Sequence, residues 1–180
     1  MSSPPAPAVS VVVPVYRNRA TLEELVERID TALAGEDHEL VLVVDGCPDD
    51  SLELCRDLTA GRPHLRVVEL ARNYGQHAAL CAGFEAARGP VVLLLDADLQ
   101  QDPADLPKFL AAWRGGAEFV SGYRTGRVDA ARRRIGSWGM NRLVRTVTHV
   151  PLKDWGCPMA AIDRRIVDQV KDCGEQRRFL

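Results

Sequence analysis

The sequence predicts an α/β fold in which a central, mostly parallel sheet is flanked by helices. Short apolar segments rich in β-branched residues alternate with segments whose apolar residues recur at helical spacing, in four strand–helix rounds. This alternation is typical of parallel strands joined by crossover helices. Val91–Leu95 is apolar at every position, as expected for a strand buried on both faces. With 180 residues, 46% of them hydrophobic, the chain suits one domain with a full core.

Five short apolar runs mark the expected strands. Val9–Val15 is rich in valine, whose branched side chain fits a pleated surface, and Pro14 and Tyr16 mark its end. Each later run follows a segment of helical character, so the strands recur at regular intervals. The expected strands are Val9–Val15, Leu40–Val44, Leu65–Leu70, Val91–Leu95 and Glu118–Ser121.

Four helices are expected between these strands. The first carries apolar residues at helical spacing from Leu22 to Leu33, and Thr21 with Glu24 has the form of a capping box at its start. Gly89-Pro90 stops the third helix, because proline cannot continue it. The remaining helices are expected at about Asp50–Thr59, Gln76–Ala87 and Pro103–Trp113.

Composition and cysteine spacing exclude several classes of protein. No apolar run approaches the ~20 residues of a membrane-spanning helix, so the chain as given is not expected to cross a membrane. Residues 1–8, rich in Pro, Ser and Ala, lack signal-peptide features and are expected to form a flexible tail before a single domain over 9–180. Five scattered cysteines without a CxxC pair argue against a disulfide framework or a zinc site and favour a cytoplasmic location.

Charge is segregated along the chain, although the formal net charge is only −2. Seven arginines and one acidic residue lie between Gly122 and Arg145. Arg132, Arg133 and Arg134 precede apolar residues at helical spacing, which predicts a basic helix with an apolar face. That face either packs on the sheet or lies on an anionic membrane surface. A nucleic-acid partner is not expected, because the chain is not basic overall and lacks aromatic residues interleaved with the basic ones.

Polar clusters follow three of the expected strands. Asp45 to Asp49 follows the second strand, Arg72 to His77 the third, and Asp96 to Gln100 the fourth. Open parallel sheets bind ligands at the carboxyl ends of their strands, so these clusters are expected to share one site.

The Asp96-x-Asp98 pair is the most informative motif. Two carboxylates one residue apart repel each other unless a cation lies beside them. Their oxygen atoms suit Mg²⁺ or Mn²⁺, which can bridge to substrate phosphates. The alternative interpretation is a helix-capping turn ahead of Pro103.

The other two clusters suggest contacts to a nucleotide. Asp45 and Asp49 could accept hydrogen bonds from a base and a ribose, or could instead form an ordinary Asp-Gly turn. Arg72 could face a diphosphate or lie on the surface. His77 could cap or pack at a helix start, or could contact the ligand. The sequence lacks the GxGxxG and GxxxxGK patterns of classical dinucleotide and P-loop sites.

At these residues the sequence resembles the family 2 inverting glycosyltransferases with the GT-A fold. Within that family it most resembles the polyprenyl-phosphate glycosyltransferases, the group that includes dolichyl-phosphate mannose synthase and undecaprenyl-phosphate aminoarabinose transferases. The supporting motifs are VVVPVY from Val11, VDGCPD from Val44, RNYGQH from Arg72, LDADLQ from Leu95, Gly122-x-Arg124-x-x-Arg127, and Asp154-Trp155-Gly156-Cys157 before Arg164 to Asp168.

The resemblance implies roles at the matching positions. Pro14 and Tyr16 would border the nucleotide pocket, with Asp45 near the base. Asp96 and Asp98 would hold the donor diphosphate through Mg²⁺ or Mn²⁺. The remaining implied positions are Gln100 near the donor sugar; Arg124, Arg127 and Arg132 beside the phosphates or the acceptor; and Asp154 in the acceptor-side loop. Residues 9–122 would then form the donor half, and 123–180 an Arg-rich acceptor side.

The expected activity is transfer of a sugar from a nucleotide-diphosphate sugar to a polyprenyl phosphate at the inner face of a membrane. A transferase acting on a hydroxyl acceptor, with Asp154 as base, and a non-catalytic nucleotide- or partner-binding module are the alternatives. Members of the family often carry Asn-Glu where Arg17-Asn18 stands, and Asp and Ser where Val44 and Cys47 stand. These departures affect base recognition more than the metal site.

The resemblance also bears on the length of the chain. Lipid-phosphate transferases usually continue into an amphipathic segment and membrane helices. The sequence is therefore either a truncated piece or a short form with another acceptor or a separate membrane partner. A homo-oligomer is the remaining alternative for its assembly.

Overall fold

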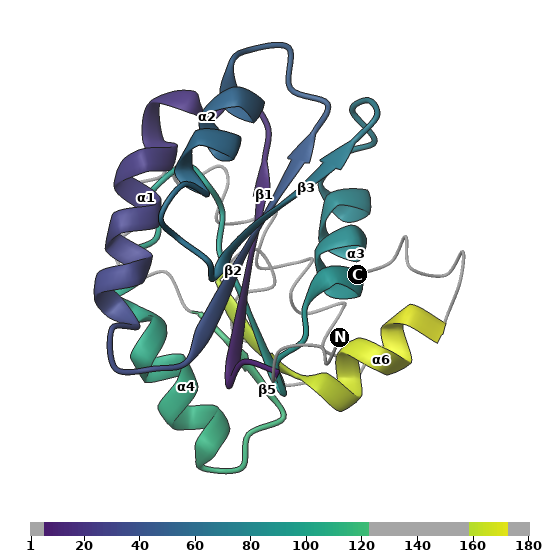
Figure 1. Cartoon of the computed structure of the whole chain (residues 1–180). Coiled ribbons are helices and arrows are strands. Elements are labelled where there is room, and N and C mark those ends of the chain that lie inside the picture. The colour runs from purple at the N-terminus through teal and green to yellow at the C-terminus, as the bar shows by residue number, and fades with distance from the viewer. Residues whose placement is uncertain (1–5, 123–158, 173–180) are drawn as a thin grey trace, which may run out of the picture.

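The computed structural model describes residues 6–122 and 159–172, which form a six-stranded sheet between two layers of helices (Figure 1). Helices α1, α2 and α4 cover one face of the sheet, and α3 and α6 cover the other. The strands are β1 (Val9–Val15), β2 (His38–Asp45), β3 (Leu65–Leu70), β4 (Val91–Leu94), β5 (Phe119–Ser121) and β6 (Ala160–Asp163). The helices are α1 (Arg19–Ala32), α2 (Ser51–Leu58), α3 (Gln76–Ala86), a 3₁₀ turn (Pro103–Asp105), α4 (Leu106–Arg114) and α6 (Arg164–Asp172).

The predicted mostly parallel sheet is confirmed. The strand order is β3-β2-β1-β4-β6-β5, and the first four of these strands run parallel. Val12 of β1 lies opposite Val41 of β2 on one side and Leu94 of β4 on the other. The chain moves outward from β1 to β3 and then returns to the other side of β1 as β4. The crevice between β1 and β4 is therefore the topological switch point, where such sheets bind ligands.

Strand β6 was not predicted from the sequence, and it changes the edge of the sheet. It runs antiparallel between β4 and β5, so that Ala161 lies opposite both Leu93 and Val120. The segment Ala160–Asp163 is short and contains two alanines, so its sequence carries little strand signal. Pairing with neighbours on both sides is what makes it a strand.

The centre of the sheet is apolar on both faces, as predicted from the runs without alternation. Val11 and Val13 pack in the cluster that includes α1, α2 and α4, whereas Val12 packs toward α3, and all three are fully buried. Gly83 lets α3 approach β1 closely, because a Cβ there would lie 2.2 Å from Cγ1 of Val12.

The predicted capping box at the start of the first helix is wrong. Helix α1 begins at Arg19, and Asn18 occupies the N-cap position without a side-chain cap. Thr21 lies inside the first turn, where its hydroxyl donates to the carbonyl oxygens of Asn18 (3.0 Å) and Ala97 (2.5 Å). Thr21 therefore ties the start of α1 to the loop that follows β4.

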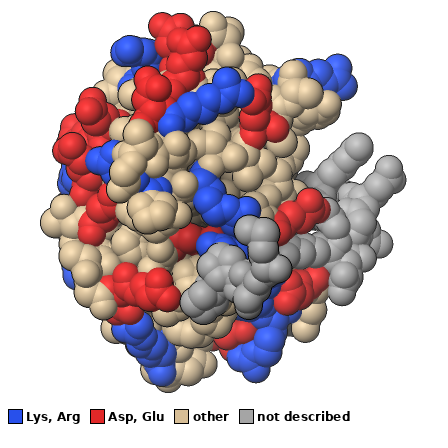
Figure 2. Space-filling view, in the orientation of Figure 1, with Lys and Arg blue, Asp and Glu red and all other residues tan. Residues whose placement is uncertain are grey.

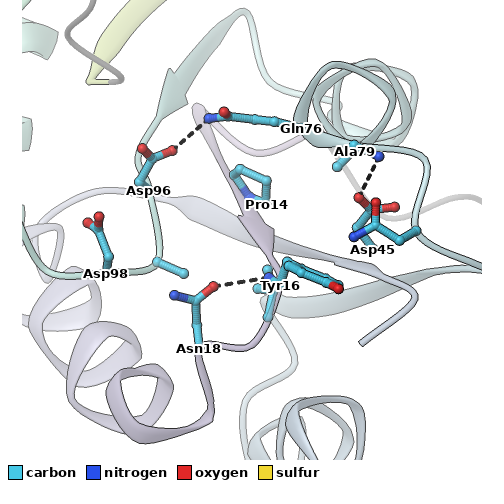
Figure 3. Close-up of a pocket in the computed structure, with 12 residues that line it drawn as sticks. Pro14, Tyr16, Asn18, Asp45, Gln76, Ala79, Asp96 and Asp98 are labelled. Atoms are coloured by element: carbon cyan, nitrogen blue, oxygen red, sulfur yellow. Dashed lines mark hydrogen bonds between the residues drawn. The ribbon is translucent and has the colours of Figure 1, made fainter. Parts of the chain in front are cut away.

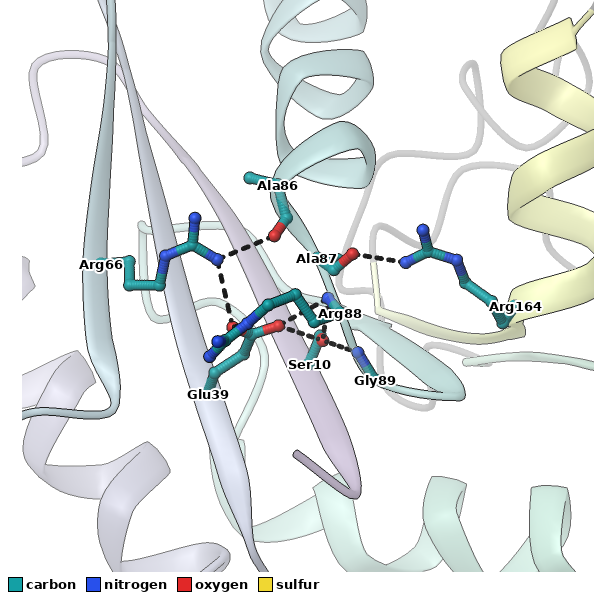
Figure 4. A network of polar contacts seen from close by, with 8 residues as sticks. All are labelled: Ser10, Glu39, Arg66, Ala86, Ala87, Arg88, Gly89 and Arg164. Carbon is teal, nitrogen blue, oxygen red and sulfur yellow. Dashed lines mark hydrogen bonds and ion pairs between the residues drawn. The ribbon is translucent and has the colours of Figure 1, made fainter. Parts of the chain in front are cut away.

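A buried carboxylate organises the amino-terminal edge of the parallel strands (Figure 4). Glu39 is 1% exposed, and its Oε1 accepts hydrogen bonds from the Ser10 hydroxyl and the Arg88 backbone N–H, both at 2.7 Å. Its Oε2 lies 2.8 Å from Nε of Arg88 and 3.3 Å from Nη1 of Arg66. The Ser10 hydroxyl in turn accepts from the Gly89 N–H at 2.8 Å. Both carboxylate oxygens are thus matched by donors, as a buried charge requires.

Polar and charged groups elsewhere on the surface are mixed in sign. Figure 2 shows acidic and basic side chains interspersed over the face in view.

Within the predicted tail, Pro7 is buried and the Ala8 N–H donates to the Asp37 carbonyl oxygen at 2.8 Å. None of the described helices is both long and apolar enough to cross a membrane. The predicted basic helix after Arg132 lies outside the described residues.

Candidate active site

A pocket of about 330 Å³ opens at the carboxyl ends of β1, β2 and β4, at the switch point of the sheet (Figure 3). Three loops that are far apart in sequence supply its walls, together with the start of α3. It is lined by Pro14, Val15, Tyr16, Asn18, Asp45, Asn73, Gly75, Gln76, Ala79, Asp96, Ala97 and Asp98. The three polar clusters that the sequence indicates therefore converge, because parallel strands bring their carboxyl ends to one edge.

Asp96 and Asp98 project from the loop that follows β4. Oδ1 of Asp96 accepts a hydrogen bond from the Gln76 side chain at 3.1 Å, as Figure 3 shows. Oδ1 of Asp98, an exposed residue, accepts from the Gln100 backbone N–H at 3.0 Å. Leu99, between Asp98 and Gln100, has a φ of +57°, so this turn places a side chain in a conformation that favours glycine. The loop thus holds two carboxylates at the pocket within a strained turn.

Asp45 lines the same pocket but is 3% exposed. Its two carboxylate oxygens accept hydrogen bonds from the backbone N–H groups of Tyr74 and Gly75, each at 2.8 Å. Gly46 makes this approach feasible, because its φ is +55° and a Cβ there would lie 2.2 Å from the Arg72 carbonyl carbon. Asp45 therefore fixes the loop after β3 and so shapes the pocket wall.

Tyr16 and Asn18 form the rim that follows β1. Tyr16 is 40% exposed, and its backbone N–H donates to Oδ1 of Asn18 at 3.0 Å. The Arg17 guanidinium lies 5.3 Å from the centre of the Tyr16 ring, and Arg17 has a φ of +59°. An exposed aromatic ring on a pocket rim offers a flat apolar surface to a ligand.

The start of α3 contributes backbone dipoles to the pocket. Gly75, Gln76 and Ala79 line it, and Gly75 at the N-cap position supplies no side-chain cap. The first N–H groups of an α-helix have no partner within the helix, and the helix dipole makes this end partly positive. An anionic ligand is therefore favoured at this wall.

Three predicted donor contacts are not among the residues that line the pocket. Oδ1 of Asp49 accepts from the Ser51 N–H at 3.3 Å, at the start of α2. The Arg72 guanidinium stacks over the Tyr74 ring at 4.9 Å. Gln100 is exposed next to Asp98, and His77 is exposed in the first turn of α3.

The predicted acceptor-side residues lie outside the described part of the chain: Arg124, Arg127, Arg132 and Asp154. Conversely, the pocket includes polar residues to which the sequence analysis gave no role, namely Asn18, Asn73 and Gln76. Each stands inside or beside a motif, so proximity to a motif was the available signal. The side chains that turn toward the pocket are set by the loop conformations, which the motifs do not reveal.

The cysteines near this edge are not suited to nucleophilic chemistry. Burial raises the pKa of the Cys47 thiol, and it raises that of Cys55 to about 12. Sγ of Cys47 lies 3.4 Å from the Val15 carbonyl oxygen. Both thiols therefore remain protonated at neutral pH, and a covalent cysteine intermediate is not expected.

Comparison with known sequences identifies the family. A sequence model described as glycosyl transferase family 2 matches residues 10–170. The chain belongs to this family. The expected resemblance is thus confirmed over nearly its whole length.

Similar proteins in bacteria carry the name undecaprenyl-phosphate 4-deoxy-4-formamido-L-arabinose transferase. The protein from Pseudomonas savastanoi pv. phaseolicola is 42% identical over 180 residues, which cover 98% of this chain and 53% of that protein. The protein from Klebsiella pneumoniae subsp. pneumoniae is 38% identical over 183 residues, covering 100% of this chain and 56% of that protein. The chain thus spans about half the length of the curated relatives it matches.

Solved structures confirm the GT-A fold. Glucosyl-3-phosphoglycerate synthase from Mycobacterium tuberculosis, in complex with Mn²⁺, UDP and phosphoglyceric acid, superposes with a TM-score of 0.70 and 21% identity over 89% of this chain and 57% of that chain. A mannosyltransferase from Pyrobaculum calidifontis, in complex with GDP-Man and Mn²⁺, gives a TM-score of 0.66 and 21% identity over 92% of this chain and 47% of that chain.

Proposed function

We propose that the protein transfers a sugar from a nucleotide-diphosphate sugar to a polyprenyl phosphate, with inversion at the anomeric carbon. The observation that carries the proposal is the pocket at the switch point, where Asp96 and Asp98 share one cavity with Asp45 and Tyr16. The undecaprenyl-phosphate transferases among the relatives support the class of acceptor.

The donor atoms at the pocket fit a hard divalent cation, Mg²⁺ or Mn²⁺. Asp96 and Asp98 present carboxylate oxygens, the ligands that both ions prefer. Among the described residues, no lysine or arginine forms an ion pair with Asp98, so that carboxylate is not already neutralised. The ion would offset the negative charge that develops on the departing diphosphate.

The residues of the chain itself would bind and orient the donor. Tyr16, Asp45 and Asn73 would contact the nucleoside, and the first turn of α3 would face the diphosphate with its unpaired N–H groups. Asp49, Arg72 and Gln100 lie on the loops around the pocket, where they would complete the donor contacts.

The acceptor phosphate needs no strong general base, because it is ionised at neutral pH. Its oxygen would form the new bond to the anomeric carbon while the bond to the diphosphate oxygen breaks, and the diphosphate leaves with the electron pair. Arg124, Arg127 and Arg132 would bind the phosphates of the acceptor and the donor, and Asp154 would lie on the acceptor side. A peripheral position at the inner face of the membrane would suit the basic segment, since each basic residue contributes ~1 kcal/mol near anionic lipid.

The test is transfer to undecaprenyl phosphate in vesicles that contain anionic lipid. UDP-, GDP-, CDP- and dTDP-sugars are supplied in turn with Mn²⁺ or Mg²⁺, and glycosylated polyprenyl phosphate is detected by mass spectrometry. We expect product from one donor class, lost with excess chelator. Transfer only to a hydroxyl acceptor, or nucleotide binding without turnover in any mixture, would replace this proposal with one of its alternatives.

A further inference from the structure

A second group of ligand-type side chains lies at the opposite edge of the sheet from the pocket. It consists of Asp30 near the end of α1, His38 at the start of β2 and His64 just before β3. One carboxylate oxygen and one nitrogen from each ring all lie within 4.8 Å of one another. This group serves none of the roles proposed above.

Hydrogen bonding fixes which nitrogen of His38 faces the group. Nδ1 of His38 lies 3.1 Å from the Glu36 carbonyl oxygen, which can only accept a hydrogen bond. Nδ1 therefore donates to that carbonyl, which leaves Nε2, 3.4 Å from Oδ1 of Asp30, as the nitrogen that a metal ion would bind. A ring whose other nitrogen donates to a backbone carbonyl is the usual arrangement of a histidine that binds metal.

The spacing of the ligand atoms suits a tetrahedral ion. Nε2 of His64 lies 2.8 Å from Oδ1 of Asp30, and Nε2 of His38 lies 3.4 Å from the same oxygen. Ligands at ~2.0–2.1 Å from a tetrahedral ion stand about 3.4 Å apart, so small side-chain rotations would place all three around one centre. The Asp30 and His64 side chains are 27% and 29% exposed, which leaves room for a water ligand.

The second oxygen of Asp30 is already engaged. Nε of Arg62 lies 3.4 Å from Oδ2 of Asp30, whereas the two histidines face Oδ1. Arg62 thus orients the carboxylate while Oδ1 remains directed at the imidazole rings.

From this geometry we propose that Asp30, His38 and His64 bind a transition-metal ion of the Zn²⁺ type. Two imidazole nitrogens and one carboxylate oxygen favour Zn²⁺ over Mg²⁺, which prefers oxygen ligands. The bound ion links α1 to the starts of β2 and β3 and stabilises the folded chain by mass action. The site is separate from Asp96 and Asp98, and its existence does not depend on the glycosyl-transfer proposal.

The test uses metal-free protein titrated with Zn²⁺ in excess Mg²⁺, followed by calorimetry and by nitrogen-detected NMR of the imidazole rings. We expect Zn²⁺ to shift the resonances of His38 and His64, and the unfolding temperature to rise. His64→Gln and His38→Gln should each lower the Zn²⁺ affinity by more than ~100-fold, since even outer-sphere changes cost 10–100-fold.

His77→Gln is the matched control, because His77 is exposed on α3 outside this group. It should bind Zn²⁺ as the unaltered protein does. Unmoved His38 and His64 resonances at saturating Zn²⁺ would overturn the proposal. So would Zn²⁺ binding that survives undiminished in both histidine variants, because residues outside this group would then be the ligands. The imidazole spectra of the unaltered protein keep the test decisive even if a variant unfolds.

Discussion

Carboxylates at the two edges of the parallel sheet differ in burial and in the number of hydrogen-bond donors around them. At the amino-terminal edge, Glu39 is 1% exposed and is surrounded by the Ser10 hydroxyl, the Arg88 backbone and two guanidinium groups. At the carboxyl edge, Asp98 is exposed and accepts a hydrogen bond from one amide of its own loop. A buried carboxylate without donors would be too costly to keep, so Glu39 is matched and belongs to the fold. Asp98 keeps the capacity to bind a ligand.

Asp45 is buried and hydrogen-bonded like Glu39, but it lies at the pocket like Asp98. It is 3% exposed and matched by two backbone amides, yet it lines the pocket beside Asp96. Its hydrogen bonds hold the loop after β3 in place. The comparison therefore separates carboxylates that maintain the pocket from those that are available to a ligand.

The largest effect is expected for Asp98→Ala. In the proposed function Asp98 holds the divalent ion that offsets the charge developing on the diphosphate, so its loss should lower kcat/KM for sugar transfer by about 10²–10³-fold. Because Asp98 is exposed, the free energy of unfolding should change by no more than about 0.5 kcal/mol. Steady-state kinetics and urea unfolding measure the two quantities. Asp57→Ala, at an exposed acid on α2, is the control and should leave both unchanged.

Glu39→Ala should show the reverse pattern. The loss of a buried charge leaves Ser10, Arg88 and Arg66 without their acceptor, so the free energy of unfolding should fall by about 3–5 kcal/mol. Activity per folded molecule should be nearly normal, because the network lies at the edge away from the pocket. A stable Glu39→Ala protein with impaired donor binding would contradict the division between the two edges.

Gly46→Ala tests whether the pocket wall is fixed by close backbone packing. The new Cβ would meet the Arg72 carbonyl carbon at 2.2 Å in a left-handed conformation, so we expect a loss of about 2–4 kcal/mol and weaker nucleotide binding. Gly61→Ala is the matched control, since Gly61 also has a positive φ but, among the described residues beyond its chain neighbours, no atom lies within 4 Å of the added Cβ. It should cost about 1–2 kcal/mol and leave nucleotide binding unchanged.

Acid should weaken the hydrogen-bond network around Glu39 at the amino-terminal edge of the sheet. Burial alone would raise the pKa of Glu39, but hydrogen bonds from Ser10 and Arg88 and the charge of Arg88 lower it below its ordinary value of 4.5. The stabilisation is therefore present above pH 4.5 and is lost as the pH falls through the lower pKa of the folded state. The difference in unfolding free energy between the unaltered protein and Glu39→Gln should stay constant from about pH 7 to pH 5 and shrink at lower pH. A difference that stays constant down to pH 3 would count against this network.

Thr21→Val should have the smallest effect. It removes the hydroxyl that links α1 to the Ala97 carbonyl oxygen, so we expect a loss of about 1 kcal/mol and a modest rise in KM for the donor. Thr31→Val on the same helix is the control, because the Thr31 hydroxyl donates to the Glu27 carbonyl oxygen one turn earlier in α1 itself. Equal KM values for the two variants would show that Thr21 does not position the loop.

Much of the fold was predictable because its signals are local. The valine-rich β1 and the uniformly apolar β4 indicate strands buried on both faces, and the alternation with helices indicates a parallel sheet. Strand β6 was not predictable, because its extended conformation depends on pairing with β4 and β5 and not on its own sequence. The capping role of Thr21 was mispredicted since its hydroxyl has a distant partner, the Ala97 carbonyl oxygen.

For the site, the sequence by itself determined which residue types reach the carboxyl edge: acids after β2 and β4, and an amide-rich loop after β3. Strand direction fixes that edge, and strand direction follows from the alternation of strands and helices. Only the tertiary structure decided that Asp45 holds the loop of Tyr74 and Gly75, that Arg72 stacks on Tyr74, and that Gln76 contacts Asp96. Likewise, only it brought Asp30, His38 and His64 together. Apart from the Arg72–Tyr74 stacking, these contacts join residues far apart in sequence. The geometry of all of them depends on loop conformation and register, which short-range patterns do not encode.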